Sequence, residues 1–278
     1  MWDAARERLL WVDIYAGAVH EGTLSGREVV PGRVLHRGDG MVGAVAVAAD
    51  GTLLVAEQEA LVAVRPDGSR AELGRVVPAG EPRRLNDGAT DPAGRFLVGT
   101  MLLDEDGAPA GREVLVRLEA DGSLTGIDDD LGLSNGLAWS GDGRRFFSTD
   151  TDRQTVYVRD YDAATGAVGE RRTHLRLDEG HPDGCTTDAE DHLWVAVFGL
   201  GQVRRYAPDG AHVGTVEVPA PHTTSVAFAG DDLRTLVITT GSVELGEEER
   251  RAHPLSGHLF TARTDVPGLP VPLWRGLD

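Results

Sequence analysis

Residues 92–98 read Pro92-Ala93-Gly94-Arg95-Phe96-Leu97-Val98, a tight turn followed at once by an apolar run. Pro and Gly favour the turn, and the aromatic and β-branched residues after it favour a strand. A turn followed by a β-branched or aromatic run recurs in five other segments, at residues 5–12, 50–56, 141–147, 189–195 and 231–238. The chain therefore repeats one short unit six times.

The apolar anchors of these segments are regularly spaced. Successive anchors lie 43, 43, 50, 47 and 43 residues apart; they are Leu10, Leu53, Phe96, Phe146, Leu193 and Leu236. A period in the forties that contains several short strands and turns is typical of a β-propeller blade. The 36 glycines also disfavour long helices. We therefore expect an all-β fold, a six-bladed β-propeller with a central channel, in which residues 1–278 form a single domain.

Composition excludes several classes of function. The net charge of −18 argues against a nucleic-acid backbone binder and against docking on anionic membranes, since both need clustered basic residues. The single cysteine, Cys185, excludes an internal disulfide and a cysteine-cluster zinc site, and a small buried residue is its expected role. The longest apolar run, Met41 to Ala49, is too short to span a bilayer, and no signal pattern opens the chain. A cytoplasmic protein is predicted.

The repeat register marks one position with polar side chains. Ten or eleven residues before the anchor lie Asn86, Asn135, Asp183 and Ser225, whereas the second repeat has Gly43 there. The same position in each blade falls at the same height and radius, so four oxygen-bearing side chains would converge on one axis. Such oxygens suit a hard divalent cation such as calcium. Asn-Asp-Gly, Asn-Gly and Pro-Asp-Gly are also ordinary turn formers, and spacing alone leaves both interpretations open.

Pro-Asp-Gly occurs three times, and position separates one copy from the others. The copies at 66–68 and 208–210 follow a strand, as plain turns do. The copy at 182–184 follows a loop and precedes a new blade. Asp183 is therefore a candidate site residue, whereas the other two aspartates are not.

Several motifs in the same order resemble the senescence-marker-protein/gluconolactonase/regucalcin family. They are Arg84-Leu85-Asn86-Asp87-Gly88 with residues 91–96 and 99–101, Ser134-Asn135-Gly136-Leu137-Ala138-Trp139, Pro182-Asp183-Gly184 with residues 188–190 and 193–196, and Thr223-Thr224-Ser225. The resemblance covers nearly the whole chain. It implies a six-bladed propeller and a metal-dependent lactonase that opens a small-molecule lactone of the sugar type.

The resemblance also implies roles for single residues. Asn135 and Asp183 would hold one divalent metal ion, calcium by first choice, with zinc, manganese and magnesium as other candidates. Arg84 and Asn86 would contact the substrate. A further substrate contact falls on Asp104, although Leu102 and Leu103 replace more polar residues in that loop.

One family ligand has no counterpart in the sequence. The family carries a metal-ligating Glu just before a Pro-x-Trp in the first blade, and Trp2 matches that Trp. The Glu, and the strand that precedes it, would fall upstream of Met1. We expect the chain to begin inside the first blade, either because it starts late or because the site has lost a charged ligand.

A lactonase needs water delivered to the carbonyl, and Asp183 is the predicted general base as well as a ligand. A serine hydrolase is the first rival, because Gly132-Leu133-Ser134-Asn135-Gly136 matches a nucleophile elbow. That motif requires a helix after the serine, and the turn at residues 140–143 leaves no room for one. The second rival is a non-catalytic propeller that binds a metal or another ligand.

Overall fold

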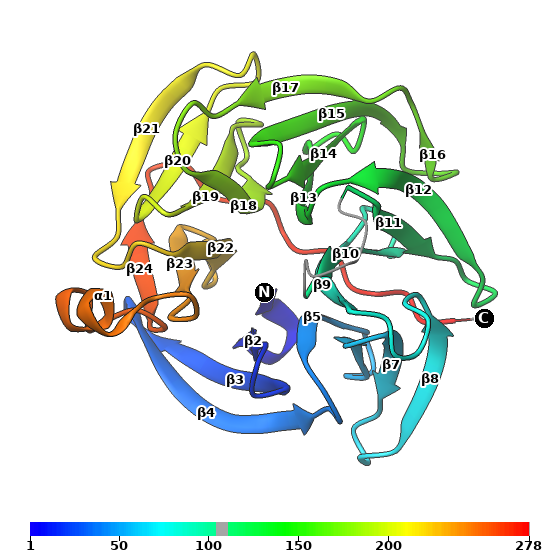
Figure 1. Cartoon of the computed structure of the whole chain (residues 1–278). Helices are drawn as coiled ribbons and strands as arrows, with labels where there is room; N and C mark the ends of the chain where they lie inside the picture. Colours follow the sequence, from blue (N-terminus) through cyan, green and yellow to red (C-terminus); the bar gives the residue numbers. More distant parts are fainter. Residues whose placement is uncertain (104–110, 278) are drawn as a thin grey trace.

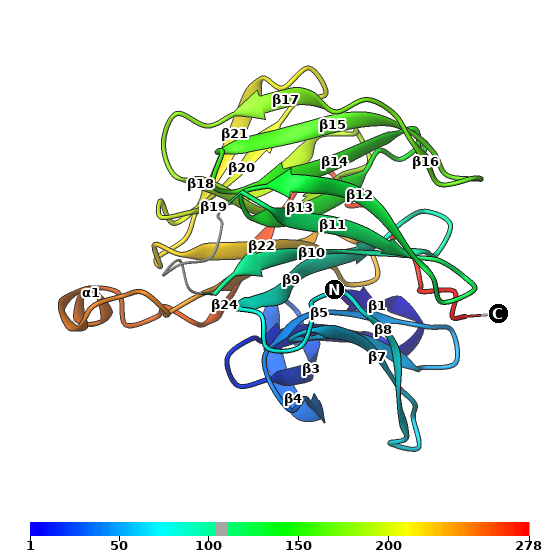
Figure 2. The same cartoon turned by 45° about the vertical axis from the view of Figure 1, so that its right-hand side comes forward.

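The computed structural model describes residues 1–103 and 111–277. Six antiparallel sheets surround a central axis, so the fold is the predicted all-β, six-bladed β-propeller (Figure 1). The helices among the described residues are η1 (Ala4–Arg6) and α1 (Glu247–Ala252), and α1 projects outward from the ring in both views (Figures 1 and 2). Neither has the length or apolarity of a membrane-spanning helix.

Each blade is one sheet whose strands follow the chain outward from the axis. Blade 1 contains β1 (Trp2–Asp3), β2 (Arg8–Asp13), β3 (Ala18–Ser25) and β4 (Glu28–Arg37), and blade 2 contains β5 (Val42–Val47), β6 (Leu53–Glu57), β7 (Ala60–Val64) and β8 (Arg70–Arg75). Blade 3 contains β9 (Arg83–Thr90), β10 (Phe96–Leu102), β11 (Glu113–Leu118) and β12 (Leu124–Leu131), and blade 4 contains β13 (Ser134–Trp139), β14 (Arg145–Asp150), β15 (Thr155–Asp162), β16 (Ala167–Val168) and β17 (Arg172–Arg176). Blade 5 contains β18 (His181–Thr187), β19 (Leu193–Phe198), β20 (Gln202–Tyr206) and β21 (His212–Glu217), and blade 6 contains β22 (Thr223–Ala229), β23 (Thr235–Thr240) and β24 (Leu259–Arg263).

The six anchors lie in the second strand of each blade, and all six are buried. They belong to apolar clusters that fill the spaces between neighbouring sheets: one cluster joins blades 2 and 3, another blades 4 and 5, and a third blades 5 and 6. Both faces of a blade are therefore buried, because each blade packs on the next. This is the physical reason for the six-fold repetition of an apolar strand in the sequence.

The first blade has four strands although its innermost one is short. In β1, Trp2 pairs with Leu9 and Asp3 with Arg8. Blade 6 has three strands among the described residues. A further strand upstream of Met1 stays a prediction from the family resemblance.

Residues 264–277, which we call the C-terminal strap, cross one face of the propeller (Figure 1). The strap first meets blade 6, where the amide of Gly268 donates to the carbonyl of Leu233 at 2.8 Å. It then reaches blades 2 and 3, where the amide of Trp274 donates to the carbonyl of Val47 at 2.9 Å and the amide of Arg275 donates to the carbonyl of Gly94 at 3.0 Å. The Trp274 side chain is 5% exposed and packs in the cluster between blades 2 and 3. These contacts lie at the carboxyl ends of the innermost strands.

Candidate active site

The innermost strands share an irregularity near their amino-terminal ends. In blades 2 to 6 the innermost strand carries one residue more than its partner strand, and the extra residue falls at Gly43, Asn86–Asp87, Gly136, Asp183–Gly184 and Thr224. A bulge of this kind breaks the strand's alternation and re-aims a side chain, and such bulges are common beside active sites. The fold thus repeats one local distortion at one height around the axis.

Asn86 ties blade 3 to blade 4 at this height. Its side-chain amide donates to the carbonyl of Ser134 at 2.9 Å, while its Oδ1 accepts a 2.8 Å hydrogen bond from Nη1 of Arg84. The same Arg84 nitrogen donates to the carbonyl of Leu85. Arg84 and Asn86 are both buried, so the two predicted substrate contacts form one hydrogen-bonded pair on β9.

Asn135 ties blade 4 to blade 5 in a similar way. Its Nδ2 donates to Oγ1 of Thr151 at 3.0 Å, and that hydroxyl donates to the carbonyl of Pro182 at 2.7 Å. Because the amide nitrogen is engaged, Asn135 has its side-chain oxygen left for another partner. Asp183 directly follows Pro182, so the chain segments that carry the two predicted metal ligands lie side by side.

Close approach of the blades requires glycine at the bulge. Gly136 has φ +27°, and a Cβ there would lie 2.4 Å from the carbonyl oxygen of Asp183. At Gly43, a Cβ would lie 2.3 Å from the carbonyl oxygen of Asn86. Any larger residue would push neighbouring blades apart. These two glycines are therefore needed for the close packing of the blades at the site as well as for the bulge in the strand.

Two carboxylates at the site have raised pKa values. Burial, followed by repulsion from Asp87, raises the pKa of Asp183 well above its usual range, while the Gly184 amide and the charge of Arg84 oppose the shift. Burial likewise raises the pKa of Asp87 to about 6, against backbone hydrogen bonds from Gly88 and Gly136. Within the described residues no arginine or histidine forms an ion pair with Asp183. Without a cation the site therefore favours the protonated forms of these carboxyls, and a bound cation would favour their ionised forms.

Arg84 is the positively charged side chain that acts on Asp183. Burial lowers its pKa to about 10, although Tyr15 and Asp183 act in the opposite direction. The guanidinium therefore remains charged at neutral pH. Its buried Nε has no hydrogen-bond partner among the described residues, so it retains a donor for a ligand.

The donor set fits a hard cation. Asn135 and Asp183 supply an amide oxygen and a carboxylate, the ligand types that calcium and magnesium prefer. The described part of the chain contains no group of three His, Cys, Asp or Glu side chains placed to hold a metal. A cation at this site would accordingly complete its coordination with amide, carbonyl or water oxygens.

The other predicted residues have different outcomes. Ser225 lies at the same height and close to Gly184 of the neighbouring blade. A Cβ atom added to Gly184 would lie 2.3 Å from the hydroxyl oxygen of Ser225. Asp104 lies outside the described residues. The Asp67 and Asp209 side chains cap their own turns by accepting from the amides two residues ahead, as plain Pro-Asp-Gly turns do. Asp183 instead lies within β18, as its register predicted.

Two rival nucleophiles are unsuited to the role. Ser134 begins β13, is buried, and is followed by a strand where an elbow requires a helix. Cys185 is buried as expected, and burial raises the pKa of its thiol. A thiol held protonated in this way is a poor nucleophile.

Two residues of the candidate site were not marked by the sequence pattern. Asp87 follows Asn86 in what looked like an Asn-Asp-Gly turn, and only its place at the β9 bulge, where its charge acts on Asp183, reveals a perturbed carboxyl. Thr151 comes from the turn between β14 and β15, away from the repeated position. The repeat register could have found Asp87, because it shares a bulge with Asn86, but no sequence signal marked Thr151.

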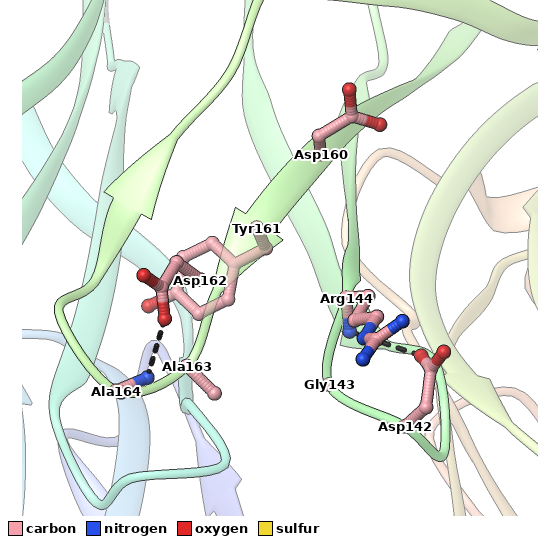
Figure 3. Close-up of a pocket in the computed structure, with 8 residues that line it drawn as sticks. All are labelled: Asp142, Gly143, Arg144, Asp160, Tyr161, Asp162, Ala163 and Ala164. Carbon is pink, nitrogen blue, oxygen red and sulfur yellow. Dashed lines mark hydrogen bonds between the residues drawn. The ribbon is translucent and has the colours of Figure 1, made fainter.

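A separate surface hollow lies between the β13–β14 turn and the end of β15 (Figure 3). It is lined by Asp142, Gly143, Arg144 and residues 160–164. Asp142 and Asp162 accept hydrogen bonds from amides of their own turns. The hollow lies at the opposite end of β13 from Asn135, so it is not part of the site.

Comparison with known proteins agrees with this fold. The model of the family described as "SMP-30/Gluconolactonase/LRE-like region" matches residues 1–242. Pentonolactonase XacC of Haloferax volcanii is 36% identical over 282 residues, which cover 99% of this chain and 92% of that protein. A 6-deoxy-6-sulfogluconolactonase of Pseudomonas putida is 32% identical over 99% of this chain and 94% of its own length.

A solved structure is similar over the same extent. It is a calcium-binding protein, regucalcin, from Agrobacterium tumefaciens, with a TM-score of 0.90 and 29% identity over 99% of this chain and 92% of that one. The fold, the family match and the two lactonase relatives agree with one another. This chain belongs to the SMP-30/gluconolactonase/regucalcin family.

Proposed function

We propose that this protein is a divalent-metal-dependent hydrolase that opens a sugar-type lactone. The observation that carries the proposal is the partly buried carboxyl of Asp183, whose pKa is raised and which forms no ion pair within the described residues. It follows Pro182, to which Asn135 is tied through Thr151, and Arg84 and Asn86 lie on blade 3. The names of the pentonolactonase and sulfogluconolactonase relatives support a sugar-derived lactone as the substrate class. Calcium is the first metal to test, followed by zinc, manganese and magnesium.

Each residue has a chemical task in this proposal. Held by Asn135 and Asp183, a divalent cation would polarise the lactone carbonyl and lower the pKa of water. The Asp183 carboxylate takes a proton from the attacking water while the oxygen of that water bonds to the carbonyl carbon of the lactone. The ring C–O bond then breaks, and the proton passes to the departing oxygen to give a hydroxy acid.

Arg84 and Asn86 position the substrate. The charged guanidinium can donate to the lactone carbonyl or to a ring hydroxyl by a charge-assisted hydrogen bond. Asn86 holds Arg84 through its Oδ1 and is itself fixed by Ser134, so both donors are set before substrate arrives. Preorganised donors of this kind stabilise developing charge without reorganisation.

The test is lactone hydrolysis by this chain after chelation and after return of each metal. We expect activity with at least one cation and its loss in Asp183→Ala. Hydrolysis by Asp183→Ala at the parental rate would refute the mechanism. The Asp178→Ala variant, which changes an exposed residue just before β18, should retain activity and serves as the control.

A non-catalytic propeller that binds a metal or another ligand is the second candidate. It is favoured by the lack of a three-residue His, Cys, Asp or Glu cluster among the described residues, because a cation held by Asn135 and Asp183 alone would activate water poorly. The same experiment separates the two: calcium binding by calorimetry, without hydrolysis of any sugar lactone, would support the binding function.

A further inference from the structure

Two aromatic rings from different blades stack near the candidate site. The Phe198 and His222 rings have centroids 3.9 Å apart and planes inclined by 17°. Phe198 ends β19 in blade 5, His222 precedes β22 in blade 6, and a β-bridge joins the two residues. We call them the aromatic pair.

The aromatic pair lies at the same end of the propeller as Asp183. Phe198 pairs across the sheet with His181, two residues before Asp183. Trp194 and Ala196, which precede Phe198 in β19 on the same face of the strand, pack in the cluster between blades 5 and 6. Phe198 continues that face beyond the cluster and is only partly buried. One face of the Phe198 ring is covered by His222, which is itself only partly buried, so the accessible part of the pair lies beside the site.

Blade 6 faces blade 3 across the axis of a six-bladed ring, as β22 faces β9 in Figure 1. Arg84 and Asn86 lie on β9. His222, at the start of blade 6, therefore lies across the axis from the polar pair on blade 3, and Phe198 lies on blade 5 together with Asp183.

The hydrogen bonding of His222 leaves one ring nitrogen free to accept. Nδ1 lies 3.2 Å from the carbonyl oxygen of Val243. A carbonyl oxygen can only accept, so Nδ1 carries the hydrogen and Nε2 of the neutral ring is an acceptor. A ring hydroxyl could donate to that nitrogen.

We propose that the aromatic pair is a substrate-binding wall that receives the C–H face of a sugar ring, with a hydroxyl donating to Nε2 of His222. This inference rests on the proposed sugar-lactone function and names residues that would bind the sugar ring. The face of an aromatic ring is electron-rich and attracts the weakly positive C–H groups of a sugar, while the hydroxyls at the ring's edge need polar partners. Arg84 and Asn86 on one side and the aromatic pair on the other meet both needs.

The first experiment compares Phe198→Leu with Phe198→Tyr in sugar-lactone hydrolysis. Leu fills much of the volume but has no ring face, whereas Tyr keeps one. We expect Phe198→Leu to raise KM about fivefold to tenfold with kcat nearly unchanged, and Phe198→Tyr to stay near the parent. His222→Leu, on the other blade, should raise KM in the same way. Unchanged thermal midpoints would show that the variants fold.

The second experiment measures binding without turnover. A 1,5-anhydroalditol keeps the sugar ring and its hydroxyls but has no carbonyl, and its affinity is measured by calorimetry. We expect the parent and Phe198→Tyr to bind it and Phe198→Leu to bind several-fold more weakly. This readout remains valid if the parent hydrolyses no lactone, so failure of the proposed function is distinguishable from failure of the wall.

Three results would overturn the wall. One is an unchanged KM and unchanged anhydroalditol affinity in both Phe198→Leu and His222→Leu. Another is a fall in kcat with KM unchanged, which would place the pair in the chemical step. The last is a parent chain that binds no anhydroalditol at millimolar concentration.

Discussion

The side-chain amide of Asn86 in blade 3 donates a 2.9 Å hydrogen bond to the main-chain carbonyl of Ser134 in blade 4. Ser134 directly precedes Asn135, so the placement of a candidate metal ligand depends on a candidate substrate contact from another blade. Asn86 also accepts from Arg84. One buried amide thus couples substrate positioning to the geometry of the metal site.

Asn86→Ala should damage stability and substrate use together. The substitution leaves the carbonyl of Ser134 and one hydrogen of Arg84 Nη1 without partners, which typically costs about 1–3 kcal/mol for a buried group. Urea unfolding should report that loss, and KM for the lactone should rise. A variant with parental stability and parental KM would contradict the coupling.

Cation binding should stabilise the parent but not Asp183→Ala. A ligand at a hundred times its Kd adds about 2.7 kcal/mol to the free energy of unfolding. We expect calcium to raise the thermal midpoint of the parent and of the Asp178→Ala control, and to leave that of Asp183→Ala unchanged. An equal rise in all three would place the cation elsewhere on the protein.

Thr151→Val should weaken metal affinity, although Thr151 need not touch the metal. The substitution keeps the side chain's shape and removes the hydroxyl between Asn135 and Pro182. Loss of such a supporting contact typically lowers metal affinity by about 10- to 100-fold. Calorimetric titration with calcium measures the change, and Thr173→Val, on the exposed outer strand β17, is the control. Parental affinity in Thr151→Val would show that Asn135 is held without it.

The stability difference between Asp87→Asn and the parent should grow with pH. In the folded state the pKa of Asp87 is raised from 3.8 to about 6, so the native state holds this proton more tightly than the unfolded chain does. The contribution of the Asp87 carboxyl to the free energy of unfolding is therefore most favourable below about pH 4 and is lost as pH rises through about pH 6. Thermal melts of both proteins with chelator, from pH 4 to pH 8, measure the difference. Asp67→Asn, which changes an exposed residue in a turn, is the control. Its stability difference from the parent should not grow with pH.

Local sequence pattern accounted for the fold and part of the site. The turn-and-strand unit is local, so its anchors identified the second strand of every blade, and the register separated Asp183 from the turn aspartates Asp67 and Asp209. Asp87 was missed because its neighbours also form a good turn. The sequence could not show that Phe198 stacks on His222, because that contact depends on how two blades pack.

The C-terminal strap has a consequence for biosynthesis. Its residues leave the ribosome after those of blades 2 and 3, yet Trp274 completes the apolar cluster between those two blades. Until then those two blades expose an unfilled apolar site to chaperones and to other nascent chains. The packing between these two blades is therefore completed only after the later blades have been made, and a truncation that removes Trp274 would impair folding at residues far from it in the sequence.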